Sequence, residues 1–138
     1  MPVQGGLLRL ETTGKGHIVD ITEGVTRVVQ TNRVDHGVVT VFARGSTVAV
    51  TTMEYEPGGV SDLQALLDRL IPVHGDYHHN RLNHDTNAHA HLRAALIGPS
   101  ESIPIVDGRL VLGTWQQVVL IDFDDRPRTR TVTVQVVS

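Results

Sequence analysis

The stretch QVVLIDFDDRPRTRTVTVQV, residues 117–136, decides the fold class of this chain. Residues 117–123 form a mostly apolar run, and residues 131–136 alternate threonine or glutamine with valine. Both patterns predict β-strands, because a strand alternates its side chains between two faces. The loop between the strands is Asp124-Asp125-Arg126-Pro127-Arg128. Since one face of the last strand is polar, we expect that face to meet water or another subunit.

Outward from this stretch, short runs rich in Val, Ile, Leu and Thr predict further strands. These strands cover residues 7–12, 17–21, 38–43, 47–52, 103–106 and 109–112. Glycine-containing turns separate them, and Asp107-Gly108 predicts a hairpin between the last two. Because strands outnumber helices and hairpins are the expected connection, the sequence predicts an α+β fold with mainly antiparallel sheets.

Two or three short helices complete the prediction. Residues 22–32 place valines at i, i+3 and i+4, with Thr22 as the N-cap, and another helix runs from Asn87 to Gly98. The clearest helix covers residues 61–71, where Ser61 and Gln64 form a capping box. We expect its leucine stripe to be buried in the core. The stripe consists of Leu63, Leu66, Leu67, Leu70 and Ile71.

Length and composition indicate one globular domain over residues 1–138, with 40% hydrophobic and 20% charged residues. The net charge of −3 and the lack of a Lys/Arg run argue against nucleic-acid binding. No apolar run is long enough for a membrane span, and no secretory signal is evident, so we expect a cytoplasmic protein. The absence of cysteine excludes disulfides, thiolate zinc sites and thiol catalysis.

Six of the eight histidines lie between His74 and His91. Imidazole binds transition metals and exchanges protons near neutral pH, so we predict that function resides in this segment. Asp76, Asp85 and Asn87 lie among the histidines and could orient them. The alternative is a solvated polar loop between two apolar elements.

Helical geometry separates His89 from His91, because residues two apart lie about 200° apart around a helix. The two imidazoles therefore cannot both bind one metal ion, and the spacing favours His89 as the partly buried structural histidine. A site that joined His79 to His91 would need a third ligand from a distant strand. No HExxH motif, phosphate-binding loop or GxSxG motif is present.

Two further features have competing interpretations. The arginines of residues 126–130 lie beside Asp122, Asp124 and Asp125, which predicts either a salt-bridged loop or a fork for an anionic ligand such as a phosphate. Trp115 is the only tryptophan, and its place before a strand predicts packing in the core or in an interface.

Several segments together resemble the YjbQ-like family, whose members are often described as secondary thiamine-phosphate synthases. They are YHHN (77–80), NAHAHL (87–92), GRLVLGTWQ (108–116) and PRTR (127–130), in an order and spacing that agree from about Asp20 onward. The resemblance implies antiparallel sheets packed as a sandwich, a homotrimer, and a pocket at the histidine segment near subunit contacts. It also implies a small-molecule ligand, such as a phosphorylated compound.

Carried over by motif, the resemblance implies His79 and His91 as catalytic residues or ligands of a divalent metal, Mg or Zn. It implies ligand contacts from a second set of residues, which comprises Asp85, Asn87, Gln116 and Arg128. The family commonly carries a His-Thr-Thr motif where this chain has Gly45-Ser46-Thr47, so the third imidazole is missing.

Three functions therefore remain open. The first is the coupling of a pyrimidine diphosphate with a thiazole phosphate. The second is non-catalytic binding of a small molecule or metal, and the third is metal-assisted hydrolysis of an unknown substrate. The absence of an imidazole at Gly45 favours binding over hydrolysis.

Overall fold

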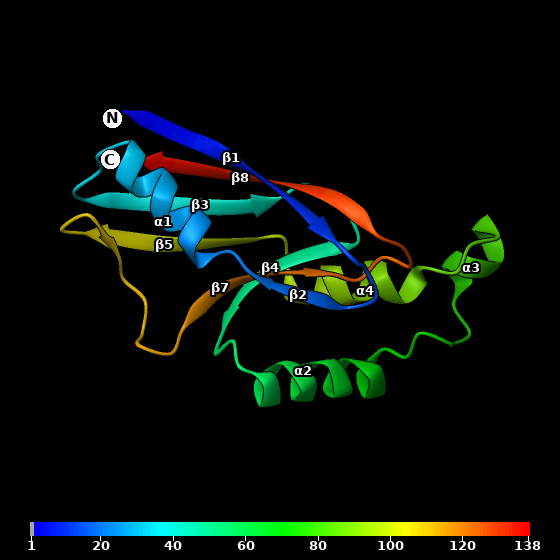
Figure 1. Cartoon of the computed structure of the whole chain (residues 1–138). Coiled ribbons are helices and arrows are strands. Elements are labelled where there is room, and N and C mark those ends of the chain that lie inside the picture. Colours follow the sequence, from blue (N-terminus) through cyan, green and yellow to red (C-terminus); the bar gives the residue numbers. More distant parts are fainter. Residues whose placement is uncertain (1) are drawn as a thin grey trace.

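The computed structural model describes residues 2–138 and contains two β-sheets and four helices (Figure 1). The strands are β1 (Val3–Thr12), β2 (His17–Asp20), β3 (Gly37–Ala43), β4 (Val48–Met53), β5 (Ser100–Val106), β6 (Arg109–Leu110), β7 (Gln117–Asp122) and β8 (Arg128–Val137). The helices are α1 (Thr22–Thr31), α2 (Pro57–Leu70), α3 (His78–Asn83) and α4 (Ala88–Ile97). The predicted α+β class is confirmed, although the structure has four helices where two or three were predicted.

The larger sheet has the strand order β1-β8-β3-β5-β6, and the smaller sheet has the order β2-β7-β4. Every neighbouring pair is antiparallel, as predicted. The expectation that hairpins are the usual connection is wrong, because only β5 and β6 pair with a sequence neighbour. The turns after β1, β3 and β7 instead carry the chain from one sheet to the other.

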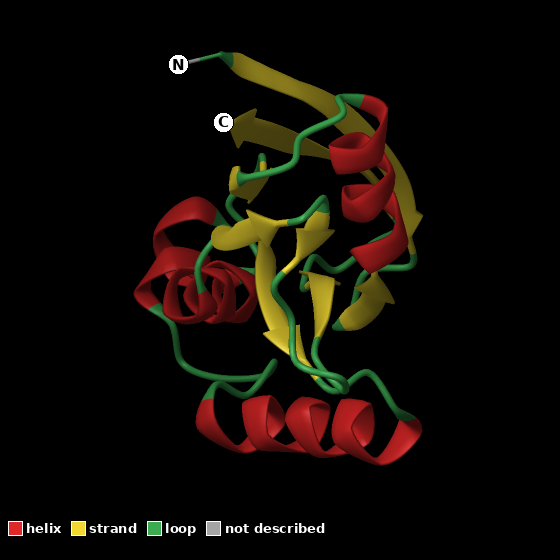
Figure 2. Cartoon of the chain, turned by 90° about the vertical axis from the view of Figure 1, so that its left-hand side faces the viewer, coloured by secondary structure: helices red, strands yellow, loops and turns green. Residues whose placement is uncertain are grey.

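Two hydrophobic cores lie on the two faces of the smaller sheet. On the central strand β7, Val118 and Leu120 contribute to the core shared with the larger sheet and α1, whereas Val119 and Ile121 contribute to the core under α2 and α4. Figure 2 shows α1 on one side of the strands, α4 on the other and α2 below them. The run 118–121 is apolar throughout because both faces of β7 are buried.

Helix α2 begins at Pro57, four residues before the predicted start. Glu56 is its N-cap, and its carboxylate accepts hydrogen bonds from the backbone amides of Gly58 and Gly59. Pro57 fits the first helical position because its missing N–H would have no intrahelical partner there. Residues 57–60, which precede the predicted start, are therefore the first turn of the helix.

The leucine stripe of α2 is only partly buried, contrary to the prediction. Leu67 is 4% exposed and Leu63 packs against the core, whereas Leu66 and Leu70 are 42% and 61% exposed. The helix touches the smaller sheet with a narrow edge, because it lies outside the layer formed by that sheet and α4 (Figure 2).

Two other local predictions differ from the structure, and one of two alternatives for Trp115 is excluded. Ile21, not Thr22, is the N-cap of α1, and the Thr22 hydroxyl donates to Asp20 at 2.6 Å. The histidine segment contains the short helix α3 in place of a continuous loop. Two side chains anchor this helix: the Tyr77 hydroxyl donates to the backbone oxygen of Pro72, and the Asn80 side-chain oxygen accepts from the backbone N–H of Ala88. Trp115 is 72% exposed and therefore does not pack in the core of the chain, so that its packing in an interface stays a prediction. Within residues 2–138, every helix is too short or too polar to cross a bilayer.

We predict that Leu67→Ala lowers the free energy of unfolding by about 2–5 kcal/mol, because it removes a buried side chain that joins α2 to the smaller sheet. Leu70→Ala on the same helix is the matched control and should change stability by less than about 0.5 kcal/mol. Urea unfolding measures both values. Equal losses in the two variants would contradict the described burial of α2.

Candidate functional site

Helices α3 and α4 bring His79 and His91 together. Their ring centroids are 4.7 Å apart and their planes are inclined by 46°. Both side chains are half-buried. Two imidazoles at this separation can transfer protons to and from one small molecule placed beside them.

Asn80 fixes the position and the tautomer of His79. The Asn80 side-chain oxygen accepts hydrogen bonds from the backbone N–H of Ala88 at 3.0 Å and from Nδ1 of His79 at 3.1 Å. Because the amide of Ala88 can only donate, the shared atom of Asn80 is its oxygen, and Nδ1 of His79 carries a proton. The neutral His79 ring therefore has its free electron pair on Nε2.

His89 lies on another face of α4, as the helical spacing predicts. It is 3% exposed, and its Nε2 is 3.6 Å from a carboxylate oxygen of Asp125. Its Nδ1 and the side-chain oxygen of Asn87 are buried without a hydrogen-bond partner in residues 2–138. Burial lowers the pKa of His89, and the nearby Arg93 lowers it further, while Asp125 raises it. The net direction is down, so His89 is held neutral.

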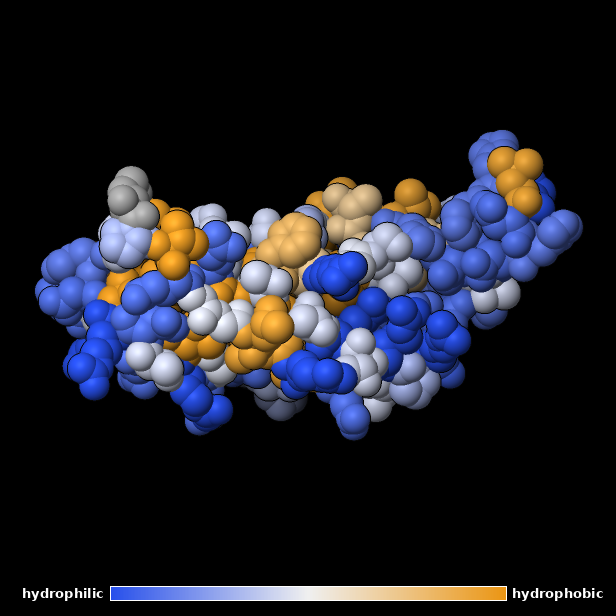
Figure 3. Space-filling view, turned by 90° about the horizontal axis from the view of Figure 1, so that it is seen from above, coloured by the Kyte–Doolittle hydropathy of each residue, from blue (hydrophilic) through white to orange (hydrophobic). Residues whose placement is uncertain are grey.

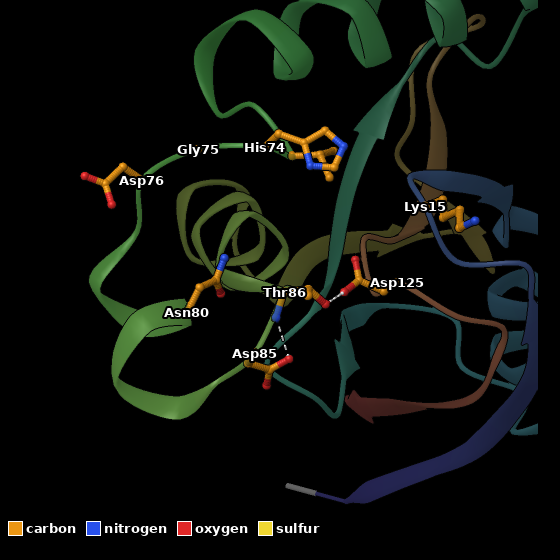
Figure 4. A pocket seen from close by; sticks show the side chains of 9 residues that line it. Lys15, His74, Gly75, Asp76, Asn80, Asp85, Thr86 and Asp125 are labelled. Atoms are coloured by element: carbon orange, nitrogen blue, oxygen red, sulfur yellow. Dashed lines mark hydrogen bonds between the residues drawn. The ribbon is translucent and has the colours of Figure 1, made fainter.

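Two hollows flank the histidine segment. The histidine hollow, about 260 Å³, is lined by His91 together with Gly45, Ser46 and Val48. The aspartate hollow, about 790 Å³, is lined by Asn80, Asp85 and Asp125, among others (Figure 4).

A short chain of hydrogen bonds forms one wall of the aspartate hollow. The backbone amide of Thr86 donates to Asp85 at 2.8 Å, and its hydroxyl donates to Asp125 (Figure 4). These bonds connect the end of α3 to the loop between β7 and β8. Asn80 contacts His79 and also lines this hollow, so it connects the hollow to the histidine pair.

The structure separates Gln116 from the other predicted site residues. Its amide donates to the hydroxyl of Thr52 at 2.9 Å, whereas His91 shares its hollow with Val48. Four residues of strand separate Thr52 from Val48, a distance of about 13 Å. Gln116 is therefore not among the residues that line the histidine hollow of this chain, and its contact with the ligand stays a prediction.

The arginine-rich loop is salt-bridged, which confirms the first of the two interpretations. Arg130 is 4% exposed and forms a bidentate ion pair with the fully buried Asp122, at 2.7 and 2.8 Å. Burial alone would raise the pKa of Asp122, but hydrogen bonds from Arg130 and Thr12 hold that pKa below its usual value. Arg128 pairs with Asp124 at 2.5 Å, so its predicted ligand contact would have to compete with this partner.

The residues present do not fit a zinc site, one of the two metal sites that the resemblance implies. Within residues 2–138, no group of three or more His, Asp or Glu side chains is arranged to hold a metal ion. Gly45, which replaces the family's histidine, lines the same hollow as His91. The chain thus supplies two imidazoles where a zinc site needs at least three protein ligands.

Sequence reasoning missed Asn80 and Thr86 as parts of the site. Asn80 stands in the YHHN segment, and its two hydrogen bonds depend on how α3 meets α4. Thr86 reaches Asp125 across 39 positions of sequence. No local signal marks such a contact.

Comparison with known proteins places these residues in context. The family described as UPF0047 protein YjbQ-like matches residues 7–138. A UPF0047 protein of Archaeoglobus fulgidus is 40% identical over 128 residues, which cover 93% of this chain and 97% of the relative. One of Methanothermobacter thermautotrophicus is 37% identical over 129 residues, covering 94% and 88%.

Solved structures show the same fold. A hypothetical protein of Aeropyrum pernix K1 has a TM-score of 0.91 and 33% identity, with 100% of this chain and 99% of that chain covered. A YbjQ-like protein of unknown function from Sulfolobus solfataricus P2 has a TM-score of 0.88 and 28% identity, with 98% of both chains covered.

We predict that His89 makes the stability of the fold depend on pH. Its pKa in the folded protein lies below the ordinary value of 6.5, so the unfolded chain binds a proton before the folded chain does. Its contribution is fully present above pH 6.5 and is lost as the pH falls toward the folded pKa. The free energy of unfolding is measured with urea at several pH values from about 7.5 to about 5, which lie on both sides of the ordinary pKa. We expect it to depend less on pH in His89→Gln than in the wild type. An unchanged slope would contradict the prediction.

Proposed function

The chain belongs to the YjbQ-like UPF0047 family, and on that premise we propose that it acts on a small molecule by proton transfer through His79 and His91. The single observation that supports the proposal is the 4.7 Å separation of the two rings. A positioned pair of imidazoles can take a proton at one end of a reaction and return it at the other.

The two histidines have different surroundings, which suits different roles. His79 is held by Asn80 with its electron pair on Nε2, so it is the residue that accepts a proton from the ligand. His91 lines the open histidine hollow and has no side-chain hydrogen bond within residues 2–138, so its ring is free to donate a proton to a departing group.

The specific reaction that we propose for this site is the coupling of a pyrimidine diphosphate with a thiazole phosphate. The reaction requires the release of a diphosphate anion, whose charge must be stabilised as it departs. Arg44 is the cation that we propose for this role, because it is exposed, precedes Gly45 in the sequence and has no ion pair within residues 2–138. Arg128 and Arg130 already pair with Asp124 and Asp122.

Non-catalytic binding of a small molecule is the second candidate. The observation that favours it is the lack of a three-ligand metal cluster in residues 2–138, because the family resemblance implies metal chemistry here. A ligand that binds without turnover would still stabilise the fold in proportion to its concentration.

We predict that His79→Ala and His91→Ala each lower the coupling rate by about 10²-fold or more, the usual contribution of a positioned acid or base. The assay follows formation of thiamine phosphate from the two substrates. His36→Ala is the control, because this exposed histidine lies beside Asp107 in a distant turn. His89→Ala should mainly reduce stability, since its ring is buried.

Equal rates in wild type, His79→Ala and His91→Ala would reject the catalytic role of the pair. If none of these proteins turns over, a thermal-shift titration with each substrate separates binding from inactivity. Loss of the shift in His91→Ala but not in His36→Ala would then support the binding candidate.

We further propose that the chain assembles as a homotrimer through the outer face of the larger sheet. On this face Val3, Leu7 and Phe42 are 57%, 66% and 44% exposed. Figure 3 shows several apolar patches, separated by polar residues, on the side that carries β1 and β8, whereas the end with α3 is mostly hydrophilic. A second copy of the chain would cover these exposed apolar side chains.

The assembly predicts a trimer at micromolar concentration in sedimentation equilibrium. Leu7→Glu places a charge in the middle of the apolar face and should shift the population toward monomer. Lys15→Glu, an exposed site on the turn between the sheets, is the control. A monomeric wild type would reject the proposal.

A further inference from the structure

A third hollow, on another side of α4 from His91, has the features of a ligand site. It measures about 180 Å³ and lies between α2 and the smaller sheet. Ile18, Leu67 and Phe123 give it an apolar floor, and Lys15 and Arg93 are the cations that line it. We name it the Arg93 hollow.

Arg93 is a buried cation whose neutralisation is incomplete. Its residue is 5% exposed, and its guanidinium lies 5.9 Å from the ring centre of Phe123. Nε and Nη2 donate to the backbone oxygen of Ile71 at 3.1 and 2.7 Å, and Nη2 also reaches Asp68 at 3.1 Å. The Asp68 side chain is 67% exposed, so water screens the only carboxylate that pairs with Arg93 in residues 2–138.

One nitrogen of the guanidinium remains available. Nη1 of Arg93 has no hydrogen-bond partner within residues 2–138, yet it is not among the buried unpaired atoms there. Because Nη2 already donates to Ile71 and Asp68, a ligand carboxylate would receive a charge-assisted hydrogen bond from Nη1 alone, without a bidentate contact.

The residues that line the hollow carry one more positive charge than negative charge. Lys15 has no ion pair in residues 2–138, although it also lines the aspartate hollow, and its amide donates to the backbone oxygen of Asp124 at 2.7 Å. With Arg93 and Asp68, the lining residues carry two cations and one carboxylate. A ligand with a single negative charge would balance this set.

Size and floor restrict the ligand further. At about 30 Å³ per water, the hollow has room for about six waters. Inorganic phosphate is strongly hydrated and makes a poor contact with apolar side chains. A short branched hydrocarbon group, in contrast, would contact Ile18 and Leu67. The fit is to a small monocarboxylate with an apolar body.

We propose that the Arg93 hollow binds a small aliphatic monocarboxylate, with its carboxylate on Arg93 and Lys15 and its hydrocarbon part on Ile18, Leu67 and Phe123. The site is separate from the His79–His91 pair, because residues 91 and 93 lie about 200° apart around α4. Its existence does not depend on the reaction proposed for the histidines.

The test compares 3-methylbutanoate with its neutral analogue 3-methylbutanamide, using the full chain and titration calorimetry. The two probes have nearly the same shape and differ in charge. We expect the carboxylate to bind about tenfold or more tightly than the amide, because only the carboxylate forms charge-assisted hydrogen bonds. Inorganic phosphate should compete weakly.

Variants locate the site. Lys15→Gln and Arg93→Gln should each weaken carboxylate binding about tenfold or more. Arg69→Gln is the control and should leave binding unchanged, because Arg69 lies on the same helix as Asp68 but is exposed and does not line the hollow. Methyl NMR signals of Ile18 and Leu67 should shift on titration. If Arg93→Gln does not fold, because it loses the contact with Ile71, Lys15→Gln and the methyl shifts decide the question.

Equal affinity for the carboxylate and the amide would overturn the proposal. So would unchanged binding in Lys15→Gln, or methyl shifts confined to residues outside the hollow. Since none of these measurements uses the histidines, a failure here leaves the function proposed for His79 and His91 untouched.

Discussion

The rest of the structure depends on the buried ion pair between Asp122 and Arg130. Asp122 ends β7 of the smaller sheet and Arg130 lies in β8 of the larger sheet, so this pair joins the two sheets at one corner. Thr12 of β1 donates a hydrogen bond to Asp122, and Thr47, which precedes β4, accepts one from Arg130. Removing one partner of such a pair costs about 3–5 kcal/mol, because the other charge stays buried. The corner is therefore a strict constraint on how the sheets meet.

The same corner positions the candidate site. The loop that follows Asp122 is held by the bond from the amide of Phe123 to the oxygen of Thr47 at 2.9 Å. Asp125 then meets Thr86 and His89 at the start of α4. Because α4 carries His91, the loop from Asp122 to Asp125 links the position of the histidine pair to the ion pair between the sheets. The charged loop thus stabilises the site without lining the histidine hollow.

The sequence predicted what depends on local patterns and missed what depends on pairing over long distances. The alternation in residues 131–136 and the apolar run 118–121 were sufficient for the strands, but the turns between strands do not reveal whether the chain returns to the same sheet. Glu56 and Pro57 do carry a local signal for a helix start, and the following glycines obscured it. Burial of the leucines differed because periodicity shows which side of a helix is apolar, not how much of it another element covers.

The predictions for the site differ in the same way, because some rest on local spacing and others do not. Helical spacing alone separated His89 from His91, whereas the approach of His79 to His91 came from the family resemblance and no spacing rule gives it. Helix α4 carries residues of both proposed sites. The small residues Ala90 and Ala94 are 0% and 6% exposed and let the helix pack closely on the smaller sheet. The helix therefore presents His91 to one hollow and Arg93 to another, and the Asn80–Ala88 hydrogen bond ties α3, which carries His79, to its first turn. Because the same Asn80 oxygen also accepts from His79, this side chain contributes directly to the spacing of the histidine pair.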